Sequence, residues 1–180
     1  TMKEVKIVVF DKTGTITKGK PEVTDIYSNV KESYLLDVAA SLEKLSEHPI
    51  AKAIVEKSKI KRYRKVKRFK VLRGRGIEGM MGVKKIVIGN RNLMNERKIN
   101  FESFGKIIGK LESEGKTVMI VSENGKAIGA IAVADDVKDD SVKAVFSLNQ
   151  DGYRTIMITG DNEKTAEAIA KKVGIKEVIA

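Results

Sequence analysis

Two acidic residues far apart in the sequence each follow a short apolar segment, and both have the chemistry to act on one ligand. Asp11 follows residues 5–10, and Asp161 comes shortly after residues 155–158. Both segments are rich in β-branched residues, as expected of strands buried on both faces of a parallel sheet. Parallel sheets bind ligands at the carboxyl ends of their strands. If the two strands are neighbours, both carboxylates should therefore lie at one edge.

The residues around Asp11 suit phosphoryl transfer. A carboxylate in this place can attack phosphorus and form an acyl phosphate. The turn over residues 12–15 offers backbone N–H groups and hydroxyls that can hold a phosphoryl group, and Thr159 can donate a hydrogen bond to the transferring oxygens. The alternative is that Asp11 only caps a turn and Asp161 only caps the helix behind it. Because each motif follows an apolar strand, we favour a catalytic role for the two motifs together over two separate caps.

Residues 11–17 (DKTGTIT) and 159–162 (TGDN) resemble the signature motifs of P-type ATPases, which belong to the haloacid dehalogenase superfamily. The resemblance implies that ATP phosphorylates Asp11 and that Thr13 contacts the phosphate and, through its carbonyl, Mg²⁺. The metal-binding residues it implies are thus Asp11 and Thr13, in a site that is incomplete in this chain. The catalytic residues it implies are Asp11, Lys12, Thr13, Thr159, Gly160 and Asp161.

Thr13 separates this sequence from the phosphatases of the same superfamily. Those enzymes usually carry a second aspartate, the general acid/base, two places after the nucleophile. Threonine cannot transfer protons near neutral pH, so an acyl phosphate on Asp11 should hydrolyse slowly, as a pump requires. A free-standing haloacid-dehalogenase-like phosphatase with a cap domain is the alternative function.

A second group of motifs resembles the nucleotide-binding domain of the heavy-metal-transporting, copper-like branch. Residues 46–49 (SEHP) lie between two expected helices, and the match implies that Glu43 contacts adenine and His48 lies in the same pocket. A structural or merely exposed histidine is the alternative. Residues 74–79 spell GxGxxG, but no helix pattern follows, which excludes a dinucleotide fingerprint. The family's GxG, GN and D-x-x-K/R motifs imply further nucleotide-binding residues: Gly74, Gly76, Gly89, Asn90 and Asp135.

Asp135 would mark the hinge between domains, and Lys138 would reach the phosphates. Two charges on the first turn of a helix are the alternative. ATP and Mg²⁺ are the cofactors that the resemblance implies. The parent pump would act at the cytoplasmic face of the cell membrane, and its transmembrane and actuator parts would be the partners of a soluble, monomeric fragment.

The fold class that these patterns predict is α/β. We expect a haloacid-dehalogenase-like, doubly wound parallel sheet, incomplete here, with an inserted α+β nucleotide-binding domain that contains an antiparallel sheet. The domain boundaries are residues 1–21 and 133–180 for the phosphorylation domain and 22–132 for the insertion. The family's phosphate-contacting lysine and GDGxxND loop do not occur after residue 178. We therefore expect nucleotide binding with little or no phosphorylation.

The amino-acid composition excludes or disfavours several other classes of function. The chain of 180 residues has no cysteine and one histidine, which leaves no thiolate or histidine-rich metal site. No apolar run approaches the roughly 18–20 residues needed to cross a bilayer. The net charge of +11 comes entirely from residues 57–75, most simply a solvated strand edge. Steering of ATP and attraction to anionic lipids are alternatives. Nucleic-acid binding is disfavoured because only Tyr63 and Phe69 could stack on bases.

Overall fold

The computed structural model describes residues 5–160 and 162–180, and it divides into two compact units. We call the first the parallel unit; it comprises Thr1–Pro21, Glu112–Thr117 and Asp135–Ala180. The second, the antiparallel unit, comprises Glu22–Leu111 and Val118–Ala134. Asp161 lies outside the described residues.

The parallel unit contains a three-stranded parallel sheet in the order β1-β8-β9, formed by Ile7–Asp11, Arg154–Ile158 and Glu177–Ile179. Its helices are α5 (Asp139–Gln150) and α6 (Glu163–Val173). The core between sheet and helices is made of small and branched apolar side chains with one methionine, and its fully or nearly buried members include Ile16, Val145, Met157, Ala166, Ile169 and Val173.

The sheet of the parallel unit is buried on one face, so the expectation that its first strand is buried on both faces is wrong. Burial alternates along β1, and Ile7 and Val9 are 46% and 51% exposed. Ile158 of β8 and Ile179 of β9, which pair in register, are exposed as well. The physical reason is that α5 and α6 pack on the other face only, and no described element covers this one.

The antiparallel unit is built on a six-stranded sheet in the order β2-β7-β6-β5-β4-β3. Its strands are β2 (Glu22–Ser28), β3 (Val66–Leu72), β4 (Gly76–Met81), β5 (Lys84–Gly89), β6 (Thr117–Glu123) and β7 (Lys126–Ala134). Its helices are α1 (Glu32–Glu43), α2 (Pro49–Ser58), α3 (Arg91–Glu96) and α4 (Gly105–Ser113), the last preceded by a short turn of 3-10 helix at Glu102–Phe104.

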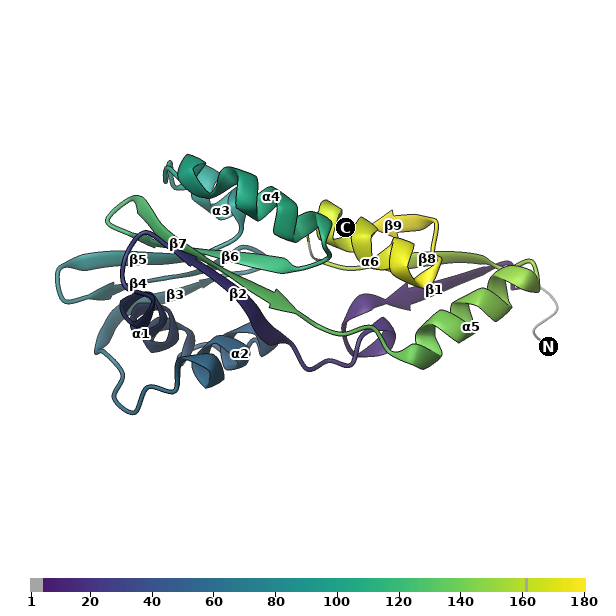
Figure 1. The fold of residues 1–180 in the computed structure, drawn as a ribbon, viewed down its shortest axis with the longest axis horizontal. Coiled ribbons are helices and arrows are strands. Elements are labelled where there is room, and N and C mark those ends of the chain that lie inside the picture. The colour runs from purple at the N-terminus through teal and green to yellow at the C-terminus, as the bar shows by residue number, and fades with distance from the viewer. Residues whose placement is uncertain (1–4, 161) are drawn as a thin grey trace. The chain divides into compact units, whose positions relative to one another are not determined.

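Helices cover both faces of this six-stranded sheet, as Figure 1 shows. On one face α1 and α2 bury Leu35, Leu42 and Ile54 against the strands. On the other face α3 and α4 bury Leu93 and Ile108. The strands alternate their side chains between these two cores, so both faces are apolar and the unit has the three layers of a stable domain.

Local sequence signals place several chain reversals correctly. The Asn124–Gly125 pair, typical of a tight hairpin, turns the chain between β6 and β7, and both residues have a positive φ. Helix α2 begins at Pro49, and α6 ends at Gly174 in the left-handed conformation. The side chain of Asn162 caps α6 by accepting a hydrogen bond from the Lys164 N–H.

The predicted fold class, an α/β unit with a parallel sheet and an inserted α+β unit with an antiparallel sheet, is confirmed. Within residues 5–160 and 162–180, every helix is too short or too polar to span a bilayer.

Candidate functional site

Parallel pairing of β1 with β8 brings the two predicted catalytic segments together at one edge. Asp11, the last residue of β1, is paired in register with Ile158, the last residue of β8. Thr159 and Gly160 therefore begin beside Asp11, and Asp11 is exposed at this edge. The two segments are therefore neighbours, as predicted, for the residues that the structure describes.

The loop after Asp11 folds back on itself. Thr13 and Gly14 leave the helical region, Thr13 through its ψ of 120° and Gly14 through its φ of +79°. The Thr17 N–H then donates to the Lys12 carbonyl at 3.0 Å and closes the loop. Lys12 is buried beneath it, whereas Thr13 is exposed. A positive φ at Gly14 is accessible to glycine with little strain, which explains the residue type at this point.

Asp135 holds this loop in place. Its Oδ2 atom accepts hydrogen bonds from the Thr17 hydroxyl at 2.5 Å and from the Gly19 N–H at 3.1 Å. Its Oδ1 atom accepts one from the Lys20 N–H at 3.1 Å. The Thr17 hydroxyl in turn accepts from the Gly14 N–H at 3.3 Å. The structure thus gives Asp135 a positioning contact with the loop, in addition to the hinge role expected from the sequence.

Lys138 brings a positive charge to the same loop. Its Nζ atom donates to the Gly14 carbonyl at 2.6 Å, and its backbone N–H donates to the Ile16 carbonyl at 3.0 Å. Lys138 precedes α5 and is the cap residue of that helix, without a side-chain cap bond. An ammonium group beside the Asp11 loop favours an anion there, because opposite charges attract most strongly where water is partly excluded.

The oxygen atoms at this loop are of the chemical type that Mg²⁺ binds. The Asp11 carboxylate and the Thr13 carbonyl are hard oxygen donors, and Mg²⁺ commonly uses one or two carboxylates together with phosphate oxygens and water. Among the residues that the structure describes, no three or more His, Cys, Asp or Glu side chains gather into a metal-binding cluster.

Glu43 is the most unusual group in the antiparallel unit. It ends α1 with its side chain almost completely buried, at 3% exposure. Its Oε1 atom has no hydrogen-bond partner among the residues that the structure describes, and burial raises the pKa of its carboxyl from 4.5 to about 7. A buried polar atom without a partner costs about 1–3 kcal/mol. Such an atom is explained when a ligand supplies the missing hydrogen bond.

His48 is exposed and begins the next helix. Its Nδ1 atom accepts a hydrogen bond from the Ile50 N–H at 3.2 Å, so the imidazole caps α2. This bond fixes the proton of the neutral ring on the other nitrogen, Nε2, which is then a donor. The imidazole thus has a structural role in this helix and keeps one nitrogen for a ligand.

The glycines of the GxG and GN motifs are required for different reasons. At Gly74 φ is +68° and an added Cβ would meet nothing within 4 Å, so the turn is open. At Gly76 a Cβ would lie 2.0 Å from the Ile88 carbonyl oxygen, and at Gly89 it would lie 2.2 Å from that of Arg75. Close approach of β4 and β5 therefore explains Gly76 and Gly89 without a ligand, while Gly74 leaves room for one.

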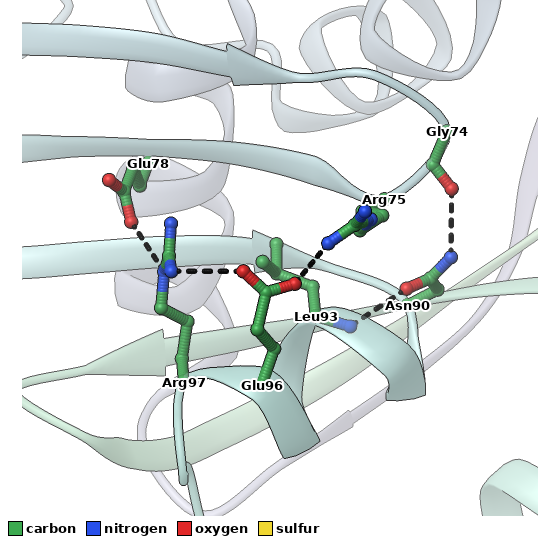
Figure 2. A network of polar contacts seen from close by, with 7 residues as sticks. All are labelled: Gly74, Arg75, Glu78, Asn90, Leu93, Glu96 and Arg97. Carbon is green, nitrogen blue, oxygen red and sulfur yellow. Dashed lines mark hydrogen bonds and ion pairs between the residues drawn. The ribbon is translucent and has the colours of Figure 1, made fainter.

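Asn90 joins the open turn to helix α3, as Figure 2 shows. Its side-chain amide donates to the Gly74 carbonyl at 3.0 Å, and its Oδ1 accepts from the Leu93 N–H at 3.1 Å. Its backbone N–H donates to the Arg75 carbonyl at 2.9 Å. Two of these bonds fix the shape of the Gly74 turn, and the third caps α3.

A chain of ion pairs extends from this turn and was not expected from the sequence (Figure 2). Arg75 pairs with Glu96, Glu96 with Arg97 at 3.1 Å, and Arg97 with Glu78 at 3.1 Å. Burial alone would raise the pKa of Glu78, but Arg97 and Lys85 outweigh it and lower that pKa. Helix α3, which supplies Glu96, has no strong sequence pattern. The sequence therefore predicted neither this helix nor its ion pairs.

The raised pKa of Glu43 predicts a pH-dependent stability. Because the folded state holds this proton more tightly than the unfolded chain, the stabilisation is complete below pH 4.5 and is lost as the pH rises through about 7. Replacing the carboxyl by an amide, in Glu43→Gln, removes the ionisation. The difference between 4.5 and about 7 predicts a gain for the variant of about 2–3 kcal/mol at pH 8 relative to pH 5.

Urea unfolding of wild type, Glu43→Gln and the exposed control Glu47→Gln at the two pH values measures this difference. An equal offset between Glu43→Gln and wild type at both pH values would contradict the assignment of a buried, proton-binding carboxyl.

Comparison with known proteins agrees with the geometry. The haloacid dehalogenase-like hydrolase family matches residues 5–180. A copper-exporting P-type ATPase of Staphylococcus haemolyticus is 45% identical over 179 residues, which cover 98% of this chain and 22% of the relative. One of Bacillus subtilis is 46% identical over 177 residues, covering 96% and 22%. The chain thus spans about a fifth of the length of these relatives.

A solved structure of the catalytic domain of the CPx-ATPase CopB-B superposes with a TM-score of 0.73 at 29% identity, covering 99% of this chain and 62% of that one. The resemblance to heavy-metal P-type ATPases drawn from the motifs is confirmed. With its Asp11 loop at the end of a parallel strand and a family match over nearly its whole length, the chain belongs to the haloacid dehalogenase-like hydrolases.

Proposed function

We propose that this chain is the ATP-binding and phosphorylation part of a heavy-metal-transporting P-type ATPase, with copper as the transported ion. In the intact pump, the antiparallel unit binds ATP and Asp11 accepts its γ-phosphoryl group. The carboxyl of Glu43, buried with an oxygen that lacks a partner, carries the proposal. It stands at the position where the resembling family contacts adenine.

Adenine offers the hydrogen bonds that Glu43 lacks. A protonated carboxyl presents one O–H donor and one carbonyl acceptor, and adenine presents an amino donor beside a ring-nitrogen acceptor. With a pKa of about 7, Glu43 is protonated in a large fraction of molecules near neutral pH. We assign His48, with its Nε2–H, and the open turn at Gly74 to the same nucleotide, together with Gly76, Gly89 and Asn90.

Asp11 is the nucleophile in this proposal. Its carboxylate attacks the γ-phosphorus, and the bond to ADP breaks. Lys138 and Thr159 offset the charge of the transferring oxygens from the two sides of the loop. Asp135 keeps the loop in shape through Thr17. Asp11 and the Thr13 carbonyl would hold Mg²⁺, which supplies neutralisation of the phosphate charge.

The names of the relatives support copper as the cargo. The two relatives reported above are copper-exporting P-type ATPases. The partners are then the transmembrane and actuator parts of the pump, with this chain at the cytoplasmic face of the membrane. We assign residues 1–21 and 133–180 to the phosphorylation domain and 22–132 to the nucleotide-binding domain. The compact units differ from this division, because residues 112–117 group with the parallel unit and residues 133–134 with the antiparallel unit. Thr13, in place of an acid/base, argues against a free-standing phosphatase.

ATP titration by calorimetry tests the nucleotide site. His48→Ala removes both the imidazole and the cap of α2, whereas His48→Asn keeps a cap acceptor and removes only the imidazole. We expect both variants to lose at least about tenfold in affinity, or about 1.4 kcal/mol. The control Lys52→Ala, on the same helix, should bind as the wild type does. Wild-type affinity in His48→Asn would reduce His48 to a helix cap and contradict its place in the site.

These 180 residues should bind ATP and yet label poorly on Asp11. Of the carboxylates described at the loop, Asp135 is occupied by hydrogen bonds from the loop itself. Without a cluster of three or more His, Cys, Asp or Glu side chains among the described residues, Mg²⁺ is weakly held. Incubation with γ-labelled ATP and Mg²⁺, followed by acid quenching, measures the transfer, with Asp11→Asn as the background. Efficient, acid-stable labelling that Asp11→Asn abolishes would show that the chain suffices for phosphorylation.

A further inference from the structure

The basic segment, residues 57–75, carries the whole net charge of the protein and has no role in the proposed chemistry. It contains eleven Lys or Arg residues and no Asp or Glu, and the other 24 basic residues are balanced by 24 acidic ones. A charge so concentrated produces a local positive potential, which acts beyond the reach of any single contact.

Most of this charge is uncompensated. Arg64 pairs with Asp37 at 2.6 Å and Arg75 pairs with Glu96. The other cations of the basic segment make no ion pair with any residue that the structure describes. The segment includes β3, the edge strand of the six-stranded sheet, and its Lys and Arg side chains are exposed. Its field therefore extends into solvent.

The aromatic residues of the basic segment are already engaged within the unit. Tyr63 lies under the Lys44 ammonium, 5.6 Å from its ring centroid, and Phe69 packs against the core beneath α1. Single-stranded nucleic acids bind by stacking bases on free aromatic rings. Tyr63 remains 38% exposed, so the segment offers many charges and one partly exposed ring, which favours a small anion over a nucleic acid.

The basic segment leads directly into the proposed nucleotide site. Strand β3 ends at Leu72, which pairs with Gly76 across the turn that contains Gly74. At roughly 3.3 Å per residue, Lys70 lies about 13 Å from Gly74 along the chain. Arg73 is adjacent to Gly74. The Debye length is about 8–10 Å at physiological salt and about 30 Å at 0.01 M, so cations at both ends of β3 act on this site in dilute salt.

We propose that the basic segment is an electrostatic guide that raises the association rate of nucleoside polyphosphates at the Gly74 turn. The inference rests on the proposed nucleotide site. The ligand is recognised by its phosphate charge alone, so the base and ribose contribute nothing to this step. Arg73, next to the turn, acts at physiological salt, and the more distant Lys70, Lys67 and Lys65 act in dilute salt.

Stopped-flow association kinetics test this, with methylanthraniloyl-ATP and the uncharged methylanthraniloyl-adenosine as probes. The near variant is Lys70→Gln/Arg73→Gln, and the far variant, at the other end of β3, is Lys65→Gln/Lys67→Gln. The control, Lys31→Gln/Lys126→Gln, removes the same charge from exposed lysines of the same unit outside the basic segment.

We expect the near variant to slow ATP association about three- to tenfold at 0.01 M salt and about twofold at 0.15 M, within the range of electrostatic steering. The far variant should slow it only at 0.01 M salt. Dissociation rates, adenosine association and the control should stay within about twofold of wild type, since steering acts on charged ligands before contact.

Three kinetic results would overturn the proposal. The near variant could match the control at 0.01 M salt, or lose ATP and adenosine association equally, or change only the dissociation rate, as a direct contact would. Tighter binding of duplex DNA than of ATP would assign the segment to nucleic acid and also overturn it. If wild type bound neither ATP nor adenosine, the proposed nucleotide site would fail as well, which separates the two claims.

Discussion

Parallel pairing of β1 with β8 is the constraint on which the catalytic geometry depends. The two strands come from nearly opposite ends of the chain, and only their register places Asp11 opposite Ile158 and so beside Thr159. A one-residue slip would turn every side chain of β1 to the other face. The loop after Asp11 is then fixed by contacts that Asp135 and Lys138 make from the returning chain. The entire antiparallel unit is inserted between these two halves.

The proposed nucleotide site of the antiparallel unit has a cost in stability. The sheet of this unit is packed on both faces, with one apolar core on each, so the unit can tolerate one unfavourable group. That group is Glu43, whose burial raises its pKa to about 7. Substitution of such groups by neutral ones commonly stabilises a protein while reducing its function. A glutamate retained in this place is therefore better explained by a ligand than by packing.

Much of the fold could be predicted because its signals are local. Alternation of apolar residues, the Asn124–Gly125 turn and Pro49 at a helix start depend on a few neighbouring residues. Helix α3 and strand β9 were missed because each is very short and is stabilised by tertiary contacts. The exposed face of the parallel sheet was also missed, since a β-branched strand has the same sequence whether one face or both are covered.

The sequence revealed the motifs of the candidate site, but it did not reveal why several of their residues are needed. The resemblance implied that Gly76 and Gly89 bind nucleotide, whereas the structure shows that two strands approach each other closely there. The partnerless oxygen of Glu43 depends on how α1 packs, which no local pattern reveals. Asp161, the acidic residue that follows β8 in the sequence, lies outside the described residues. Its place beside Asp11 stays a prediction.

The central claim is that nucleotide binds to the antiparallel unit through Glu43, His48 and the Gly74 turn, while Asp11 awaits its phosphate in the parallel unit. Backbone amide NMR of the chain, titrated with a non-hydrolysable ATP analogue, tests this most directly. We predict that the largest shifts cluster at residues 43–48, 74–76 and 89–90, and that they are reduced in Glu43→Gln. Shifts confined to the loop after Asp11, with residues 43–48 unmoved, would contradict the account.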